Sequence, residues 1–137
     1  MSEENTIVLA KILIIDDSEF SRKSISAALV DAGVNVVGTA GSAKEAAEIL
    51  KANDANLLII DIVMPDMNGI ELAKQYKEKF PDKYVILISS LSHEHIILDA
   101  ISSGASDFLR KPFRKEDLLA SIHKISQQIK EDQSMLI

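Results

Sequence analysis

Cysteine and tryptophan are absent from the 137 residues, proline occurs three times, and aromatic residues make up only 4%. The lack of cysteine excludes disulfide frameworks, thiolate metal sites and cysteine nucleophiles. No apolar run is long enough to cross a bilayer, so we expect no membrane span. Basic residues are also the minority, with 15 Lys and Arg against 21 Asp and Glu and a net charge of −6. This balance disfavours sequence-independent binding to nucleic acid, which needs clustered positive charge.

What is present describes an ordinary folded domain. The chain is 47% hydrophobic and 26% charged, and its length fits one domain. The first residues, Met1 to Thr6, are acidic where a secretory signal would be basic. We therefore expect a cytoplasmic protein. Residues 1–9 and 131–137 are interpreted as an N-terminal arm and a C-terminal tail around the domain at 10–130.

Five short apolar runs alternate with longer amphipathic stretches. The runs are Lys11 to Ile15, Asn35 to Ala40, Leu57 to Ile60, Tyr84 to Ile88 and Ser106 to Leu109. Most are nearly solid in apolar residues, which is typical of parallel strands that are covered on both faces. Strict alternation of strand and helix then predicts an α/β sandwich with helices on both sides of a parallel sheet.

Helix signals lie between the runs. Ser18 is a predicted N-cap with Gly33 as the stop, Ser42 and Glu45 form a capping-box pattern, and Asn68-Gly69 precedes a helix that ends before Pro81. The fourth predicted helix carries Ile97, Ala100 and Ile101 and ends at Gly104. In the fifth, a buried stripe is predicted at Leu118, Ile122, Ile125 and Ile129.

Polar residues follow four of the predicted strands. These residues are Asp16, Asp17, Asp61, Ser89 and Lys111. Because the carboxyl ends of parallel strands share one edge of a sheet, we expect their side chains to converge there. For Asp17 alone, a turn or cap is a sufficient explanation. Asp16 and Asp61 each end an aliphatic run, where an unpaired carboxylate is costly to bury.

Three neighbouring carboxylates raise one another's pKa unless a cation is present. Mg²⁺ suits such a site, because it accepts a few carboxylates together with phosphate oxygens. A carboxylate can then act as a nucleophile toward a phosphoryl group, while an ammonium and a hydroxyl stabilise the transferred oxygens. Lys111 and Ser89 supply these two groups. The sequence thus points to phosphoryl chemistry that requires Mg²⁺.

In this order, the residues resemble the receiver domain of two-component response regulators over roughly Lys11 to Gln128. The resemblance is carried by Ile-Ile-Asp16-Asp17-Ser18, Asp61-Ile-Val-Met-Pro65-Asp-Met-Asn-Gly69, Ile88-Ser89-Ser90, Gly104-Ala105-Ser106-Asp107-Phe108 and Lys111-Pro112-Phe113. Several motifs in order, each at a strand end, leave little room for chance. The resemblance implies a flavodoxin-like (βα)5 fold with strand order 2-1-3-4-5 and a receiver domain at 10–130.

The resemblance also implies roles for individual residues. Asp61 would accept a phosphoryl group from a phosphohistidine on a sensor histidine kinase or a histidine phosphotransfer protein. Asp17 would bind Mg²⁺ directly, Asp16 would act mainly through water, and the Val63 backbone carbonyl would complete the protein ligands. Lys111 would pair with a phosphoryl oxygen, and its bond to Pro112 is usually cis in the family.

Ser89 and Phe108 would form the switch pair, standing where Thr and Tyr are common. Their rearrangement would alter the surface of the fourth helix, fifth strand and fifth helix, which binds a downstream protein. Val63 and Leu91 are apolar where relatives carry polar residues that orient the hydrolytic water, so we expect a long-lived aspartyl phosphate and a partner phosphatase. The Asp16-to-Ser24 and Ser89-to-Ser92 stretches look most like the chemotaxis branch.

Alternatives remain open. A phosphorelay intermediate and the receiver segment of a longer regulator are both compatible with the same residues. A flavodoxin-like nucleotide or flavin site is disfavoured, because the turn Asp16-Asp17-Ser18-Glu19 would repel a phosphate. A dehalogenase-like hydrolase usually needs a second Asp where Val63 stands, so we expect a signalling domain that turns over no small substrate. Phe20 is either a packing residue or a contact for the histidine donor.

Overall fold

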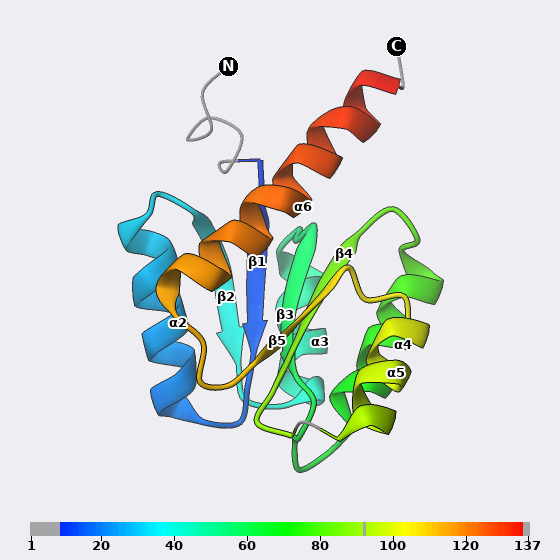
Figure 1. Ribbon diagram of the computed structural model, residues 1–137. Coiled ribbons are helices and arrows are strands. Elements are labelled where there is room, and N and C mark those ends of the chain that lie inside the picture. The colour runs from blue at the N-terminus through cyan, green and yellow to red at the C-terminus, as the bar shows by residue number, and fades with distance from the viewer. Residues whose placement is uncertain (1–8, 92, 136–137) are drawn as a thin grey trace.

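The computed structural model describes residues 9–91 and 93–135. Five parallel strands form one sheet in the order β2-β1-β3-β4-β5, with five helices around it (Figure 1). The strands are β1 (Lys11–Ile15), β2 (Asn35–Ala40), β3 (Leu57–Asp61), β4 (Tyr84–Ser89) and β5 (Asp107–Arg110). The helices are α2 (Glu19–Asp31), α3 (Ala43–Ala52), α4 (Gly69–Lys79), α5 (Glu94–Ser102) and α6 (Lys115–Met135). The predicted flavodoxin-like fold and its strand order are confirmed.

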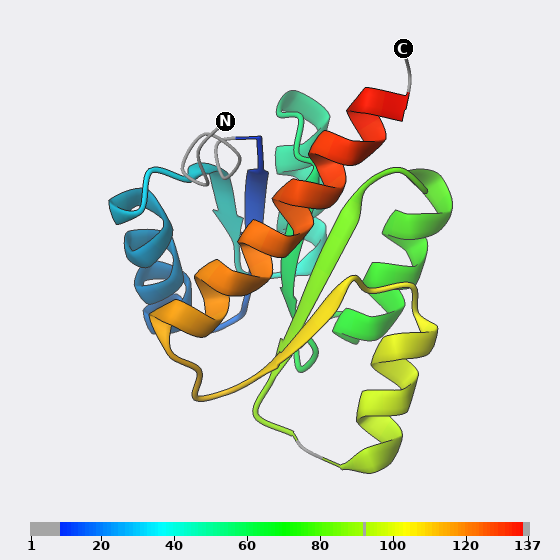
Figure 2. The same ribbon diagram turned by 45° about the horizontal axis from the view of Figure 1, so that its top comes forward.

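The sheet separates two hydrophobic cores. Alternate residues of β1, such as Ile12 and Ile14, point toward α2 and α6, while Leu13 and Ile15 point toward α3, α4 and α5. Successive side chains of a strand face opposite sides, so both faces of a central strand must be apolar. Figure 2 shows α6 crossing the sheet obliquely on the first of these faces. This double coverage explains why the strands read as solid apolar runs.

The predicted helix starts are present as hydrogen-bonded caps. Ser18 Oγ accepts from the Ser21 amide at 3.2 Å, Ser42 Oγ from Glu45 at 3.1 Å, and Asn68 Oδ1 from Ile70 at 2.8 Å. Each cap satisfies an amide that the helix itself leaves without a partner. Each cap fixes the point at which the loop after a strand enters the next helix, and so helps to position the residues of that loop.

Strands β3 and β4 continue one residue further than their apolar runs, to Asp61 and Ser89. Both residues still pair in the ladder, Asp61 with Ile88 and Ser89 with Arg110. These two polar side chains are therefore held by the sheet itself. The fifth strand lies one residue later than predicted, because Ser106 precedes the paired segment.

The last two helices differ most from expectation. In α5 only Ala100 is buried, while Ile101 is 66% exposed and Ile97 lies at 36%. In α6 the predicted stripe is buried, but the helix continues to Met135, through residues assigned to the C-terminal tail. Of the N-terminal arm, residues 1–8 lie outside the described part of the chain. No helix among the described residues has the length and apolar character needed to span a membrane.

Candidate functional site

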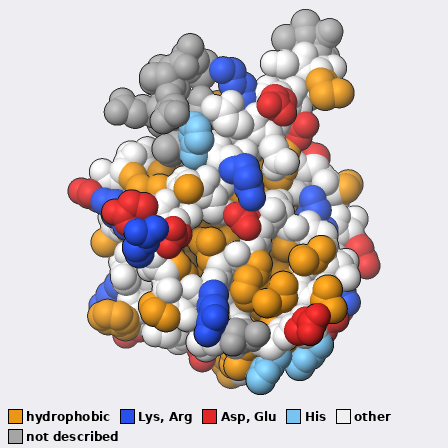
Figure 3. Space-filling model, viewed as in Figure 1, with side chains coloured by type: hydrophobic (Ala, Val, Ile, Leu, Met, Phe, Trp, Pro, Cys, Tyr) orange, Lys and Arg blue, Asp and Glu red, His pale blue; other side chains and the backbone are white. Residues whose placement is uncertain are grey.

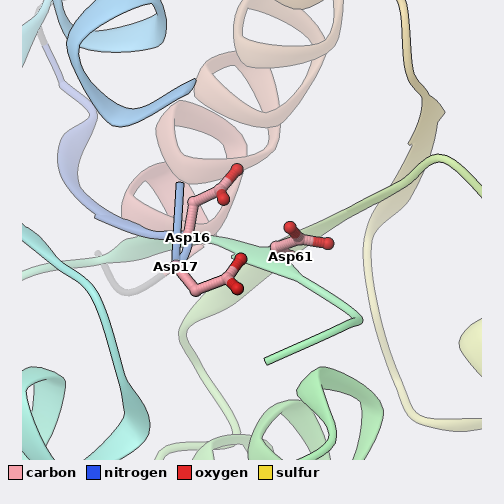
Figure 4. A group of neighbouring side chains, drawn as sticks. All are labelled: Asp16, Asp17 and Asp61. Atoms are coloured by element: carbon pink, nitrogen blue, oxygen red, sulfur yellow. The ribbon is translucent and has the colours of Figure 1, made fainter. Parts of the chain in front are cut away.

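Three carboxylates meet at the carboxyl edge of the sheet, as predicted. One oxygen from each of Asp16, Asp17 and Asp61 lies within 4.8 Å of the others. Figure 4 shows that Asp16 and Asp17 come from the end of β1, and Asp61 from the end of neighbouring β3. Asp16 is fully buried and Asp61 nearly so, whereas Asp17 is exposed. The cluster therefore has a buried floor and an open side.

The backbone around Asp16 is held by the neighbouring strand and helix. Its amide donates to the Ala40 carbonyl at 3.0 Å, and the Arg22 guanidinium donates to its carbonyl at 2.7 Å. One carboxylate oxygen also accepts from the Ser18 amide at 2.9 Å. Sequence reasoning did not identify Arg22, because its partner is a backbone atom six residues earlier and no motif marks such a contact.

Lys111 supplies the positive charge of the site. Its Nζ lies 2.8 Å from Asp16 Oδ2 and 3.3 Å from Asp61 Oδ2. The Lys111 amide also donates to the Ser89 carbonyl at 2.8 Å, so the ends of β4 and β5 are joined directly behind the cluster. The peptide bond from Lys111 to Pro112 is cis, as the family resemblance implied.

Burial and charge pull the pKa values of the two buried carboxyl groups apart. Burial raises the pKa of Asp61, and the neighbouring Asp16 charge adds to this, while Lys111 and the Val63 amide offset part of it. Burial also acts to raise the pKa of Asp16, but hydrogen bonds from Lys111 and the Ser18 amide outweigh it and hold the value low. The Lys111 pKa is raised: burial opposes this, but the Asp16 and Asp61 carboxylates outweigh it.

The remaining predicted residues lie around this cluster. Ser89 is buried at the end of β4, and its Oγ accepts from the Leu91 amide at 2.9 Å. Phe108 lies on β5 and pairs with Leu87 of β4. Its half-buried side chain packs against the core beneath α5. Val63 follows Asp61 by two residues, donates its amide to Asp61 Oδ1 at 3.2 Å, and is 52% exposed.

Gly69 fixes the far end of the loop that follows Asp61. A Cβ at this position would lie 2.2 Å from the Asp61 carbonyl oxygen and 2.7 Å from Ile62 Cα. Real Cβ atoms do not approach backbone that closely, so the first residue of α4 has to be glycine. The Gly69 amide donates to the Ile62 carbonyl at 2.8 Å. This packing role was not evident from the sequence, although Gly69 ends one of the quoted motifs.

The donor set fits a hard divalent cation. Three carboxylates are oxygen ligands of the kind that Mg²⁺ takes, with water completing its shell. Lys111 already neutralises part of the charge on the buried pair, and the exposed Asp17 leaves one side open. Asp16, Asp17 and Asp61 are the groups that would hold the ion, and the Val63 backbone carbonyl is the further ligand that the family resemblance implies.

The site and the fold have counterparts among known proteins. The family model described as response regulator receiver domain matches residues 12–123. The chemotaxis protein CheY of Bacillus subtilis is 37% identical over 114 residues, which cover 83% of this chain and 95% of that protein.

Two solved structures share the whole fold. A CheY-like receiver domain protein from Methanospirillum hungatei has a TM-score of 0.83 at 26% identity, covering 90% of this chain and 98% of that one. The structure of a CheX-CheY-BeF3-Mg complex from Borrelia burgdorferi has a TM-score of 0.82 at 28% identity, with the same coverage. The residues that the family model matches include the three carboxylates and Lys111. The chain therefore belongs to the family of response regulator receiver domains.

Proposed function

We propose that Asp61 accepts a phosphoryl group from a phosphohistidine on a partner protein, in a reaction that requires Mg²⁺. The observation that carries this proposal is the buried Asp61 carboxylate between a second carboxylate and the Lys111 ammonium. An Asp61 oxygen forms the new O–P bond, the N–P bond of the phosphohistidine breaks, and the leaving imidazole takes a proton. The protein supplies position and charge, which are the main needs of phosphoryl transfer.

Bound Mg²⁺ and Lys111 would together neutralise the negative charge of the carboxylates and of the phosphoryl group. Bound Mg²⁺ would neutralise the carboxylates and the phosphoryl oxygens, and so keep Asp61 ionised despite its raised pKa. Lys111 now divides its hydrogen bonds between Asp16 and Asp61. When Asp61 carries the phosphoryl group, Lys111 turns to one of the new oxygens. The Ser89 hydroxyl, at the end of the adjacent strand, reaches another.

This movement of Ser89 is the proposed switch. Its hydroxyl now holds the Leu91 amide, so reaching the phosphoryl group releases the start of the loop before α5. Phe108 packs on the same side of the sheet and turns into the space that opens. We propose that the surface of α5, β5 and α6 changes as a result and binds a downstream protein. Figure 3 shows hydrophobic side chains gathered over β5 and α5, where Leu98 and Ile101 are exposed.

The phosphohistidine donor has a contact surface beside the cluster. Phe20 is 83% exposed, so the packing interpretation of this residue is wrong. Its ring borders a shallow cavity of about 430 Å³ that Ser90, Pro112 and Phe113 also line, together with Lys111. An apolar wall next to a charged reaction centre suits a partner helix that presents a histidine. We propose a sensor histidine kinase or a histidine phosphotransfer protein as this donor.

The relatives of nearly equal length include chemotaxis proteins, and this likeness supports a chemotaxis role, which we propose for this chain. A phosphorelay would use the same Asp61 chemistry but pass the phosphoryl group on to a second histidine. Incubating the phosphorylated protein with candidate phosphotransfer domains separates these roles, since only a relay intermediate loses its phosphoryl group to them.

The acceptor role is tested with acetyl phosphate and Mg²⁺ on three proteins: wild type, Asp61→Asn, and Asp99→Asn as a control on exposed α5. Intact mass should show one added phosphoryl group on the wild type and the control, and none on Asp61→Asn. Omitting Mg²⁺ should abolish the addition. An unmodified wild type, or an Asp61→Asn variant modified equally, would refute the proposal.

A further inference from the structure

The loop from Ile62 to Asn68 is closed at both ends. The Ile62 amide donates to the Ile88 carbonyl at 2.9 Å, and the Gly69 amide donates back to the Ile62 carbonyl at 2.8 Å. Between these ends lies Val63, whose carbonyl belongs to the proposed cation site. The Val63 amide donates to Asp61 Oδ1 at 3.2 Å, and positions 64–67 form one excursion between this contact and Gly69.

Asp66 anchors the middle of that excursion to another helix. Its Oδ1 accepts from the Ala43 amide at 3.1 Å, and its Oδ2 accepts from the Lys44 amide at 3.2 Å. Among the described residues, these are the only hydrogen bonds that tie positions 64–67 to another element. Amides at a helix start carry partial positive charge, which favours a carboxylate there. One carboxylate thus joins the Val63 loop to the start of α3.

The start of α3 is already capped without Asp66. Ser42 Oγ binds the Glu45 amide, and Glu45 Oε2 accepts from the Gly41 amide at 3.2 Å. Asp66 therefore adds a second cap, from 23 residues away in sequence, to the two amides that the local cap leaves. For the described residues 64–67, by contrast, Asp66 is the point of attachment to another element.

We propose that Asp66 is a positioning residue for Mg²⁺: it fixes the loop so that the Val63 carbonyl faces the three carboxylates, and it links that ligand to α3. The inference rests on the proposed function of the site. Groups that orient a metal ligand typically affect affinity on the order of tenfold or more, although they never touch the ion. Linkage also runs both ways, so Mg²⁺ should in turn steady the start of α3.

The test compares Asp66→Ala with Ser42→Ala. Both variants remove a cap from the same helix end, but only Asp66 belongs to the loop that carries Val63. For wild type and both variants, Mg²⁺ affinity is measured by calorimetry and thermal stability by circular dichroism. Hydrogen exchange of the Ala43 and Lys44 amides is measured by NMR with and without Mg²⁺. We expect Asp66→Ala to weaken Mg²⁺ binding roughly tenfold. It should also lose the slowing of exchange by Mg²⁺ that wild type shows.

Ser42→Ala should lower thermal stability while keeping the wild-type Mg²⁺ affinity. Equal weakening in both variants would overturn the inference, because helix stability alone would then explain the effect. Asp66→Asn keeps one acceptor oxygen and should lie between wild type and Asp66→Ala. If it matches Asp66→Ala and added salt removes the defect, the effect is one of charge and the inference is wrong. A wild type without Mg²⁺ affinity would refute the proposed function itself, whereas normal affinity in Asp66→Ala refutes only the role of Asp66.

Discussion

Asp107 joins β5 to α6 immediately before the aromatic residue of the proposed switch. Its Oδ2 accepts from Ser121 Oγ at 2.6 Å and from Lys124 Nζ at 3.2 Å, and its Oδ1 accepts from the Phe108 amide at 2.8 Å. Burial acts to raise the pKa of Asp107, but these hydrogen bonds outweigh it and lower the value. Such a carboxylate stabilises the fold while it is ionised.

The pH dependence follows from that direction. Because the pKa of Asp107 is lower in the folded state, its contribution is complete above the unfolded pKa and is lost as pH falls through the folded one. We expect Asp107→Asn to cost about 1 kcal/mol of unfolding free energy at pH 7, measured by urea denaturation. The cost should shrink in acid, below about pH 4. Asp99→Asn, on exposed α5, should cost less at both pH values. An equal cost at acid and neutral pH would contradict this role.

The lifetime of the phosphoryl group depends on two apolar side chains. Val63 and Leu91 follow Asp61 and Ser89 by two residues, and neither can orient a water molecule. We expect the phosphorylated protein to persist for minutes or longer in Mg²⁺ alone, measured by intact mass after the donor is removed. Leu91→Glu should shorten the lifetime at least about tenfold. The same change at exposed Leu98 should not. Loss of the group within seconds from wild type would contradict the prediction.

At the scale of elements, the start of α4 lies directly on the backbone of the acceptor residue. Gly69→Ala places a methyl group where the Asp61 carbonyl and Ile62 already are, and backbone cannot move aside as a side chain can. We expect a loss of about 3 kcal/mol, measured by urea denaturation, together with weaker phosphorylation by acetyl phosphate. Gly38→Ala meets only side-chain atoms, of Ile49 at 3.2 Å and of Leu13 at 3.5 Å, and serves as the control, with a much smaller loss. Equal losses would show that the close contact is relieved at little cost.

The observed strands agree closely with the ranges that the sequence patterns predict. The ranges of β1 and β2 are correct to the residue, because an apolar run and a strand coincide there. The ends of β3 and β4 were placed one residue short, since Asp61 and Ser89 are polar but still pair in the ladder. In α5 the apolar spacing did not separate the face toward Ala100 from the exposed face with Ile101. A periodic pattern alone cannot tell a core from a binding surface.

The site itself was largely predictable, because strand ends converge in any parallel sheet. Asp16, Asp17, Asp61 and Lys111 meet as expected. The supporting contacts were not, since Arg22 binds a backbone carbonyl and Asp66 caps a helix far away in sequence. Such contacts depend on how the loops pack, which no local spacing encodes.

At the scale of the whole molecule, one exposed aliphatic side chain on each face of the sandwich can be compared with the other. Ile101 lies in the last turn of α5 and is 66% exposed, and Val30 lies in the last turn of α2 on the other face and is 62% exposed. Ile101→Lys should leave phosphorylation intact and change stability by no more than about 0.5 kcal/mol. It should abolish binding of a partner that recognises the phosphorylated form.

Val30→Lys is the matched control, because it also places a lysine at the next-to-last residue of a helix, and it should keep that partner. Binding is measured by pull-down with the beryllofluoride-loaded protein, using Asp61→Asn as the unactivated reference. Equal binding by Ile101→Lys and wild type would show that the output surface lies elsewhere.

All five strands run in one direction, so the carboxylate cluster occupies one edge of the sheet. The other edge holds the start of β1 at Lys11, and α6 returns to it and ends at Met135 (Figure 1). A fluorophore or a surface tether attached near either of these residues would stand at the pole opposite Asp61. In single-molecule and immobilised-binding assays the protein can therefore be attached at this opposite end. Its carboxylate cluster and its α5 surface then stay accessible to partners.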